Sequence, residues 1–97
     1  MKSISILGTL YFIVYVDNID GNTDLAGKTD FENKHIYFLK DISQEEYKIV
    51  FKHEVIHAFL YESGLNKYNK DEMLIDYLAM QWDKLGEIFN KELVDGE

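Results

Sequence analysis

The sequence predicts an α+β fold, in which a small antiparallel sheet packs against two helices within a single domain spanning residues 1–97. Segments with strand-like alternation occupy the first part of the chain, and two longer segments with helical periodicity occupy the second. Apolar residues make up 46% of the chain and aromatic residues 14%, which indicates a folded protein with one modest core.

Three strands are predicted in the N-terminal part. Residues 2–7 alternate in polarity and residues 10–16 are β-branched and aromatic, so both predict strands joined by a tight turn at Gly8-Thr9. Residues 17–34 are rich in Asp, Asn, Gly and Thr and predict a long loop. Residues 35–39 predict a third strand, which we expect at an edge of the sheet, where a substrate peptide would add as a further strand.

Two helices are predicted in the C-terminal part. Ser43 with Glu46 three residues later fits a capping box at the start of the first helix, and Gly64 is a typical stop. The second helix begins around residues 70–72 and continues to about Asn90, followed by a frayed acidic tail at residues 94–97. Its apolar residues recur at helical spacing and are expected in the core, and they include Met73, Leu74, Tyr77, Leu78, Met80, Trp82 and Leu85.

Composition excludes several classes of site and partner. The chain has no cysteine, so it can form neither a disulfide nor a thiolate metal site. Its net charge of -8, with ten lysines and no arginine, disfavours binding to a nucleic-acid backbone. No apolar stretch is long enough for a membrane span, and residues 2–8 lack the continuous apolar core of a signal peptide. We therefore expect a cytoplasmic protein without nucleic-acid or membrane partners, and the sequence does not indicate an oligomeric state.

The most specific motif is H-E-x-x-H at residues 53–57, inside the first predicted helix. Residues four apart lie on one face of a helix, so the imidazoles of His53 and His57 can reach the same metal ion. Glu54 lies beside them, where it can act as general base toward a water bound by that ion. The motif therefore predicts a metal-dependent hydrolase with Glu54 as its catalytic residue.

A catalytic zinc site needs a third protein ligand. Without cysteine, that ligand is either His35 or a carboxylate, and Glu72 at the start of the second helix is the preferred choice. Asp76 lies one helical turn further on, where it can accept the second ring N–H of a liganding histidine, and it is also the main competitor as third ligand. Two imidazoles and one carboxylate suit Zn²⁺ better than other divalent ions.

With these residues the sequence resembles zinc peptidases of the gluzincin kind, in which H-E-x-x-H is followed by a glutamate on a second helix. It resembles more closely the small ImmA/IrrE-type metallopeptidases associated with phages and mobile elements. The matching segments are Gly27-Lys28-Thr29-Asp30, Lys34-His35-Ile36-Tyr37, Ser43-Gln44-Glu45-Glu46 and residues 53–58.

This resemblance implies a zincin-like fold, peptide-bond hydrolysis, zinc ligands His53, His57 and Glu72, general base Glu54, and a protein or peptide substrate. Tyr68 or His35 would supply the side chain that stabilises the oxyanion of the transition state. One alternative is a catalytically silent binding protein with the same fold, which uses zinc structurally or not at all. A second alternative, an acidic mimic of nucleic acid, is disfavoured because the charges are scattered rather than arranged in rows.

Overall fold

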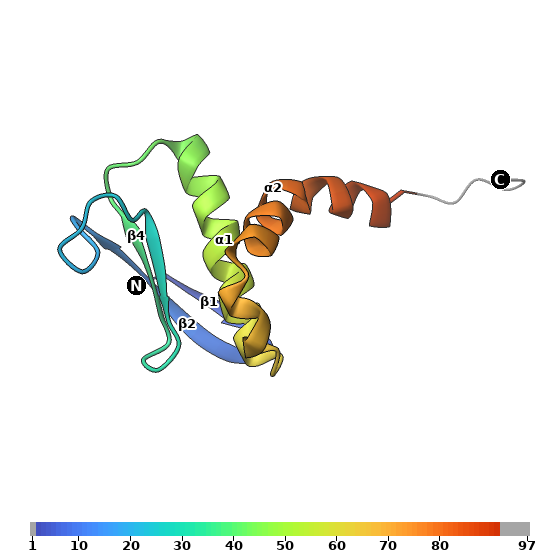
Figure 1. The fold of residues 1–97 in the computed structure, drawn as a ribbon, viewed down its shortest axis with the longest axis horizontal. Helices are drawn as coiled ribbons and strands as arrows, with labels where there is room; N and C mark the ends of the chain where they lie inside the picture. The colour runs from blue at the N-terminus through green and yellow to red at the C-terminus, as the bar shows by residue number, and fades with distance from the viewer. Residues whose placement is uncertain (1, 92–97) are drawn as a thin grey trace, which may run out of the picture.

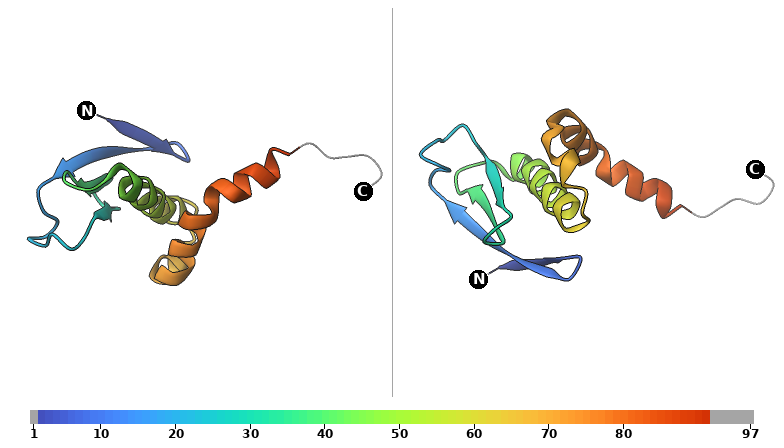
Figure 2. Two further views of the ribbon diagram at one scale, coloured as in Figure 1. Left: turned by 90° about the horizontal axis from the view of Figure 1, so that it is seen from above. Right: turned by 60° about the horizontal axis from the view of Figure 1, so that its bottom comes forward.

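The computed structural model describes residues 2–91 and confirms the α+β class. The strands are β1 (Ser3–Ile6), β2 (Thr9–Val16), β3 (Gly27–Asp30) and β4 (His35–Leu39); they are followed by α1 (Gln44–Glu62), the short 3-10 helix η1 (Asn66–Lys70) and α2 (Glu72–Phe89). The views agree that α1 lies between the sheet and α2 (Figures 1 and 2). The acidic tail predicted at residues 94–97 lies outside the described residues. Neither helix within residues 2–91 combines the length and apolarity needed to cross a bilayer.

The sheet is mixed, so the prediction of a wholly antiparallel sheet is wrong. Its order is β1-β2-β4-β3, with antiparallel pairing at both ends and a parallel β2–β4 pair in the middle. The reason is that β3 lies inside the segment predicted as a loop. It reverses the chain once more, so β4 runs in the same direction as β2. Because β4 is hydrogen-bonded on both sides, the prediction that it forms an edge is also wrong, and β3 is the edge on that side.

Strand β3 lies very close to α1, and Gly27 permits this approach. A Cβ atom on Gly27 would lie 2.7 Å from Val50 Cγ1 and 3.0 Å from Glu54 Cγ, both on α1. The first distance is shorter than real Cβ contacts and the second is tight, so a larger residue here would force Val50, Glu54 or β3 to shift. The polar composition around β3 has low strand propensity, and pairing with β4 overrides it.

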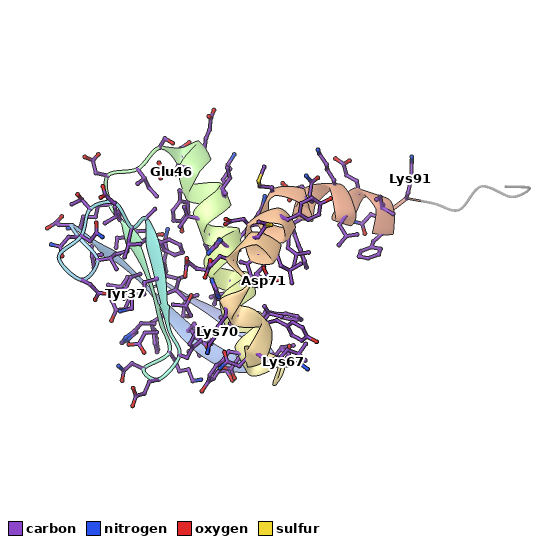
Figure 3. The ribbon with its side chains drawn as sticks, in the orientation of Figure 1. Tyr37, Glu46, Lys67, Lys70, Asp71 and Lys91 are labelled. Carbon is purple, nitrogen blue, oxygen red and sulfur yellow. The ribbon has the colours of Figure 1, made fainter. Side chains whose placement is uncertain are left out.

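The main core fills the space between the sheet and α1. Its buried members are Ile6, Tyr11, Ile13, Ile36, Phe38 and Ala58. Successive side chains of a strand point to opposite faces, so Ile36 and Phe38 face α1, whereas His35 and Tyr37 face the other side. Figure 3 shows Tyr37 on the side of the sheet away from α1. A second, smaller cluster of Ile56, Ile75 and Ala79 joins α1 to α2.

The helix boundaries follow from their caps. Ser43 Oγ accepts a hydrogen bond from the backbone N–H of Glu46 at 3.1 Å, and Gly64 follows the end of α1 with a φ of 76°, so the predicted start and stop of this helix are confirmed. Asp71 caps α2 by accepting a hydrogen bond from the backbone N–H of Leu74 at 3.1 Å.

The prediction that the apolar residues of α2 belong to the core is wrong for most of them. Only Ile75 and Ala79 are buried in this helix, because α2 contacts α1 along one side and over its first half. Large side chains elsewhere on α2 are exposed, and they include Met73, Tyr77, Met80 and Trp82.

A cluster of hydrogen-bonded polar side chains connects the C-terminal end of α1 to the sheet. The carboxylate of Glu62 accepts hydrogen bonds from Tyr11 Oη at 2.6 Å, Lys34 Nζ at 2.8 Å and Thr9 Oγ1 at 3.0 Å. Hydrogen bonding to Lys34 and then to Tyr11 holds the pKa of Glu62 below its usual value. Burial and the same bond raise the pKa of Tyr11. The cluster therefore joins the end of α1 to the start of β2, through Thr9 and Tyr11, and to the turn before β4, through Lys34.

Candidate metal centre

Three side chains from two helices converge on one point. His53 and His57 lie one turn apart on α1, and their Nε2 atoms are 3.1 Å from each other. Glu72, at the first turn of α2, has its Oε2 3.1 Å from His53 Nε2 and its Oε1 3.4 Å from His57 Nε2. Within residues 2–91 this is the one group of three side chains whose ligand atoms all lie within 4.8 Å of one another.

The outer ring nitrogens of both histidines have partners of their own. His53 Nδ1 lies 2.8 Å from Asp76 Oδ1, and His57 Nδ1 lies 3.0 Å from Asn69 Oδ1. The amide nitrogen of Asn69 donates to the backbone carbonyl of His57 at 3.1 Å, which leaves its Oδ1 as an acceptor for the ring. These two acceptors favour the tautomer with the proton on Nδ1 in both imidazoles, which leaves each Nε2 as an acceptor on the side of Glu72.

With this tautomer both Nε2 atoms present a lone pair to the same point, where a cation could satisfy them together with Glu72. The donor set of two neutral imidazole nitrogens and one carboxylate fits a divalent transition metal. The carboxylate and amide behind the rings are the kind of partners that fix tautomer and orientation in metal sites. These residues could thus hold a metal ion.

Glu54 lies beside this group and is buried, with 6% of its surface exposed. Thr29 Oγ1, on β3, lies 2.9 Å from Glu54 Oε1 and 3.1 Å from the Glu54 backbone carbonyl. The other carboxylate oxygen, Oε2, lies 3.9 Å from His53 Nε2. Burial raises the pKa of Glu54, while the Thr29 hydrogen bond and the neighbouring histidines oppose that rise.

The centre opens onto a cleft of about 460 Å³ between β3 and the helices. One wall comes from β3 and its flanks, where Leu25 and Phe31 add apolar surface. The metal group and Glu54 form the opposite wall together with Asn69. A substrate in this cleft would therefore contact β3 on one side and the candidate metal position on the other.

Two of the residues predicted for the site do not line the cleft. His35 lies on the face of the sheet opposite α1, where its ring packs 6.2 Å from Phe12 and its Nδ1 lies 3.4 Å from Tyr37 Oη. The structure therefore does not bring His35 together with His53, His57 and Glu72. Tyr68, on η1, is exposed and has the Lys67 ammonium 5.0 Å from its ring centroid. Neither side chain reaches the metal group.

Two residues of the site, Thr29 and Asn69, had no predicted role in it. Thr29 belongs to a segment predicted as a loop, and only the pairing of β3 with β4 places it over Glu54. Asn69 precedes the second helix by a few residues and carries no motif of its own. The one available signal for it is its position between His57 and Glu72, in the segment that must bring α2 back to α1.

Comparisons of the chain with protein-family models, with curated proteins and with solved structures each gave no match.

Proposed function

We propose that the chain is a zinc-dependent metallopeptidase in which His53, His57 and Glu72 hold the ion and Glu54 is the general base. The observation that carries this proposal is a buried carboxylate with one unbonded oxygen next to three converging ligand atoms. A site that used zinc only for structure would have no need for Glu54 beside it. The resemblance of residues 53–58 to small ImmA/IrrE-type metallopeptidases supports the same assignment.

When bound, zinc would act as a Lewis acid and lower the pKa of a coordinated water to near 7. The protein's own part is to place and exchange protons. Thr29 occupies Glu54 Oε1, so Oε2 is the oxygen that accepts a proton and later returns it to the leaving amine. Burial raises the pKa of Glu54 and so moves it toward neutral pH. A base whose pKa lies near the working pH both accepts and releases protons efficiently.

The substrate would be a peptide lying along β3. This strand is an edge of the sheet and forms one wall of the cleft, so its free backbone groups can pair with an extended peptide. The central position of β4 excludes that strand from the role. A peptide held by β3 passes directly over Thr29 and Glu54.

The experiment combines metal content with hydrolysis. We expect about one zinc per wild-type chain by mass spectrometry, loss of zinc in His57→Ala, and retention of zinc in Glu54→Gln. A peptide mixture incubated with wild type should gain new termini that are absent with Glu54→Gln. Absence of zinc after reconstitution would overturn the proposal. Bound zinc without any hydrolysis would instead favour a binding protein with this fold.

A further inference from the structure

Helix α2 carries a continuous apolar seam. Ile75, Leu78, Trp82, Leu85 and Phe89 follow one another at intervals of three, four, three and four residues. This is the heptad spacing of a helix that packs against another helix along its length. The seam therefore predicts a helical neighbour for both halves of α2.

Helix α1 covers only the first half of the seam. Ile75 is buried against Ile56, and an ion pair of 2.8 Å between Lys52 and Asp83 ties the middle of α2 to α1. The second half of α2 projects away from the rest of the molecule, as far as Lys91 (Figures 1 and 3). There, Trp82 is 48% exposed and Phe89 is 76% exposed.

We propose that the second half of this seam is the interface of a symmetric dimer, in which α2 of one copy crosses α2 of a second copy in the antiparallel direction. In a symmetric dimer the same patch must fit itself. An antiparallel crossing near Leu85 and Gly86 sets Trp82 of each copy against Phe89 of the other. Gly86 has no atom within 4 Å of where a Cβ would lie, so the two helices can approach closely at the crossing point.

Charge makes this face the one on which a second copy meets least repulsion. The chain carries a net charge of -8, which opposes association between arbitrary surfaces of two copies. Between residues 83 and 91, however, two acidic residues (Asp83 and Glu87) are balanced by two basic ones (Lys84 and Lys91). The projecting part of α2 is therefore the neutral and apolar part of an acidic protein.

The exposed apolar area of this face indicates how stable the dimer would be. A buried aromatic side chain removes roughly 150–250 Å² from water, so Trp82, Phe89 and the 67% exposed Ile88 offer on the order of 400 Å² per copy. A dimer through this face buries on the order of 800 Å², below the roughly 1,200 Å² of the smallest stable interfaces. The dimer is therefore expected to dissociate on dilution.

The test measures mass and tryptophan emission over a concentration series of the full chain. Trp82 is the only tryptophan, so its emission reports directly on this face. We expect the mass from light scattering to double with rising concentration, together with a blue shift of the emission. Phe89→Lys should abolish both changes, whereas Met73→Lys, on the other side of α2 and 83% exposed, should leave them intact.

Two further results bear on the proposal. Gly86→Gln, which fills the crossing point without a clash inside its own chain, should weaken the dimer while keeping the helical circular dichroism of the wild type. A monomer at every concentration would overturn the proposal. So would a dimer that persists in Phe89→Lys with unchanged Trp82 emission. None of these readouts depends on bound metal, so the outcome is independent of the proposed peptidase activity.

Discussion

Thr29 and Glu54 are joined across the boundary between β3 and α1, because Thr29 Oγ1 lies within hydrogen-bond distance of both the side chain and the backbone carbonyl of Glu54. The Thr29 hydroxyl thus orients the Glu54 carboxylate and also contacts the backbone of α1 at the same residue. The edge strand that would hold the substrate is the same strand that orients the base.

Replacing Thr29 by Val should therefore lower the rate of hydrolysis while leaving zinc in place. Valine has nearly the same shape, so the loss is that of the hydrogen bond to Glu54 Oε1, and misplacement of a base by such a change costs on the order of 10- to 100-fold in rate. The measurement is kcat on a cleaved peptide, with zinc content determined on the same samples. Thr29→Ser, which keeps the hydroxyl, is the matched control, and equal rates for Val and Ser would contradict the role of this bond.

Gly27→Ala should destabilise the protein by about 1–3 kcal/mol, the usual cost of overpacking. The new Cβ would meet Val50 Cγ1 and Glu54 Cγ, so β3 must move away from α1. Urea unfolding measures the change. Adding Val50→Ala removes the nearer of the two atoms and should restore part of the lost free energy, which a double-mutant cycle reports as coupling. Strictly additive effects would show that β3 does not pack on α1 as described.

Asp76→Asn and Asn69→Ala should each weaken zinc binding by about 10- to 100-fold, because the outer partners of liganding histidines fix the ring orientation and basicity. Asp76 acts on His53 and Asn69 acts on His57, so the effects should be similar in kind. Competition with a chromogenic chelator measures the affinity. Glu87→Gln, which changes a carboxylate of the same helix away from the site, is the control and should bind zinc as wild type does.

Zinc should raise the melting temperature of the chelator-treated protein. The ligands come from both α1 and α2, so binding favours the docked arrangement over the unfolded chain. At a free zinc concentration of about 100 times Kd, the stabilisation is roughly 2.7 kcal/mol, which corresponds to about 10–20 °C for a domain of this size. Differential scanning fluorimetry measures the shift. In Glu72→Gln the shift at the same zinc concentration should be much smaller, and an equal shift would remove Glu72 from the ligand set.

Glu62 should make the stability sensitive to acid. Its pKa is lowered in the folded protein by Lys34 and Tyr11, so its charge stabilises the fold above the ordinary value of 4.5, and this contribution is lost as the pH falls through the folded-state value. Thermal melts of wild type and Glu62→Gln should differ at pH 7, and the difference should shrink progressively as the pH falls below the ordinary glutamate value of 4.5. A difference that stays constant from pH 7 to pH 3 would show that the ionised form of Glu62 is not what stabilises the cluster.

The parts of the structure that could be predicted from the sequence are those specified by residues close together in the chain. The spacing of residues 53–57, the cap at Ser43 and the glycine after α1 each act within one or two helical turns, so the helices and the histidine pair follow from the chain itself. Pairing partners of strands are set by contacts between distant residues. The edge position of β3, the central position of β4 and the bond from Thr29 to Glu54 therefore emerged only with the tertiary structure.

The exposed residues of α2 also show that local patterns do not specify tertiary contacts. Periodicity identifies an apolar face, but it does not show which neighbour covers that face or over what length. Met73, Tyr77, Met80 and Trp82 were expected in the core and are exposed. The first three lie on sides of α2 that do not face α1, and Trp82 lies in the second half of the helix, which α1 does not cover.

If the proposed ligands hold a metal, their division between α1 and α2 also determines when that centre can form during protein synthesis. A nascent chain folds from its N-terminus, so the sheet, α1 and both histidines are available before Glu72 and Asp76 have been translated. Until α2 emerges and docks, the chain has two imidazoles without their carboxylates. The unfinished protein on the ribosome would then bind metal weakly and leave neighbouring nascent chains uncut, so that the proposed peptidase activity begins only once α2 has folded.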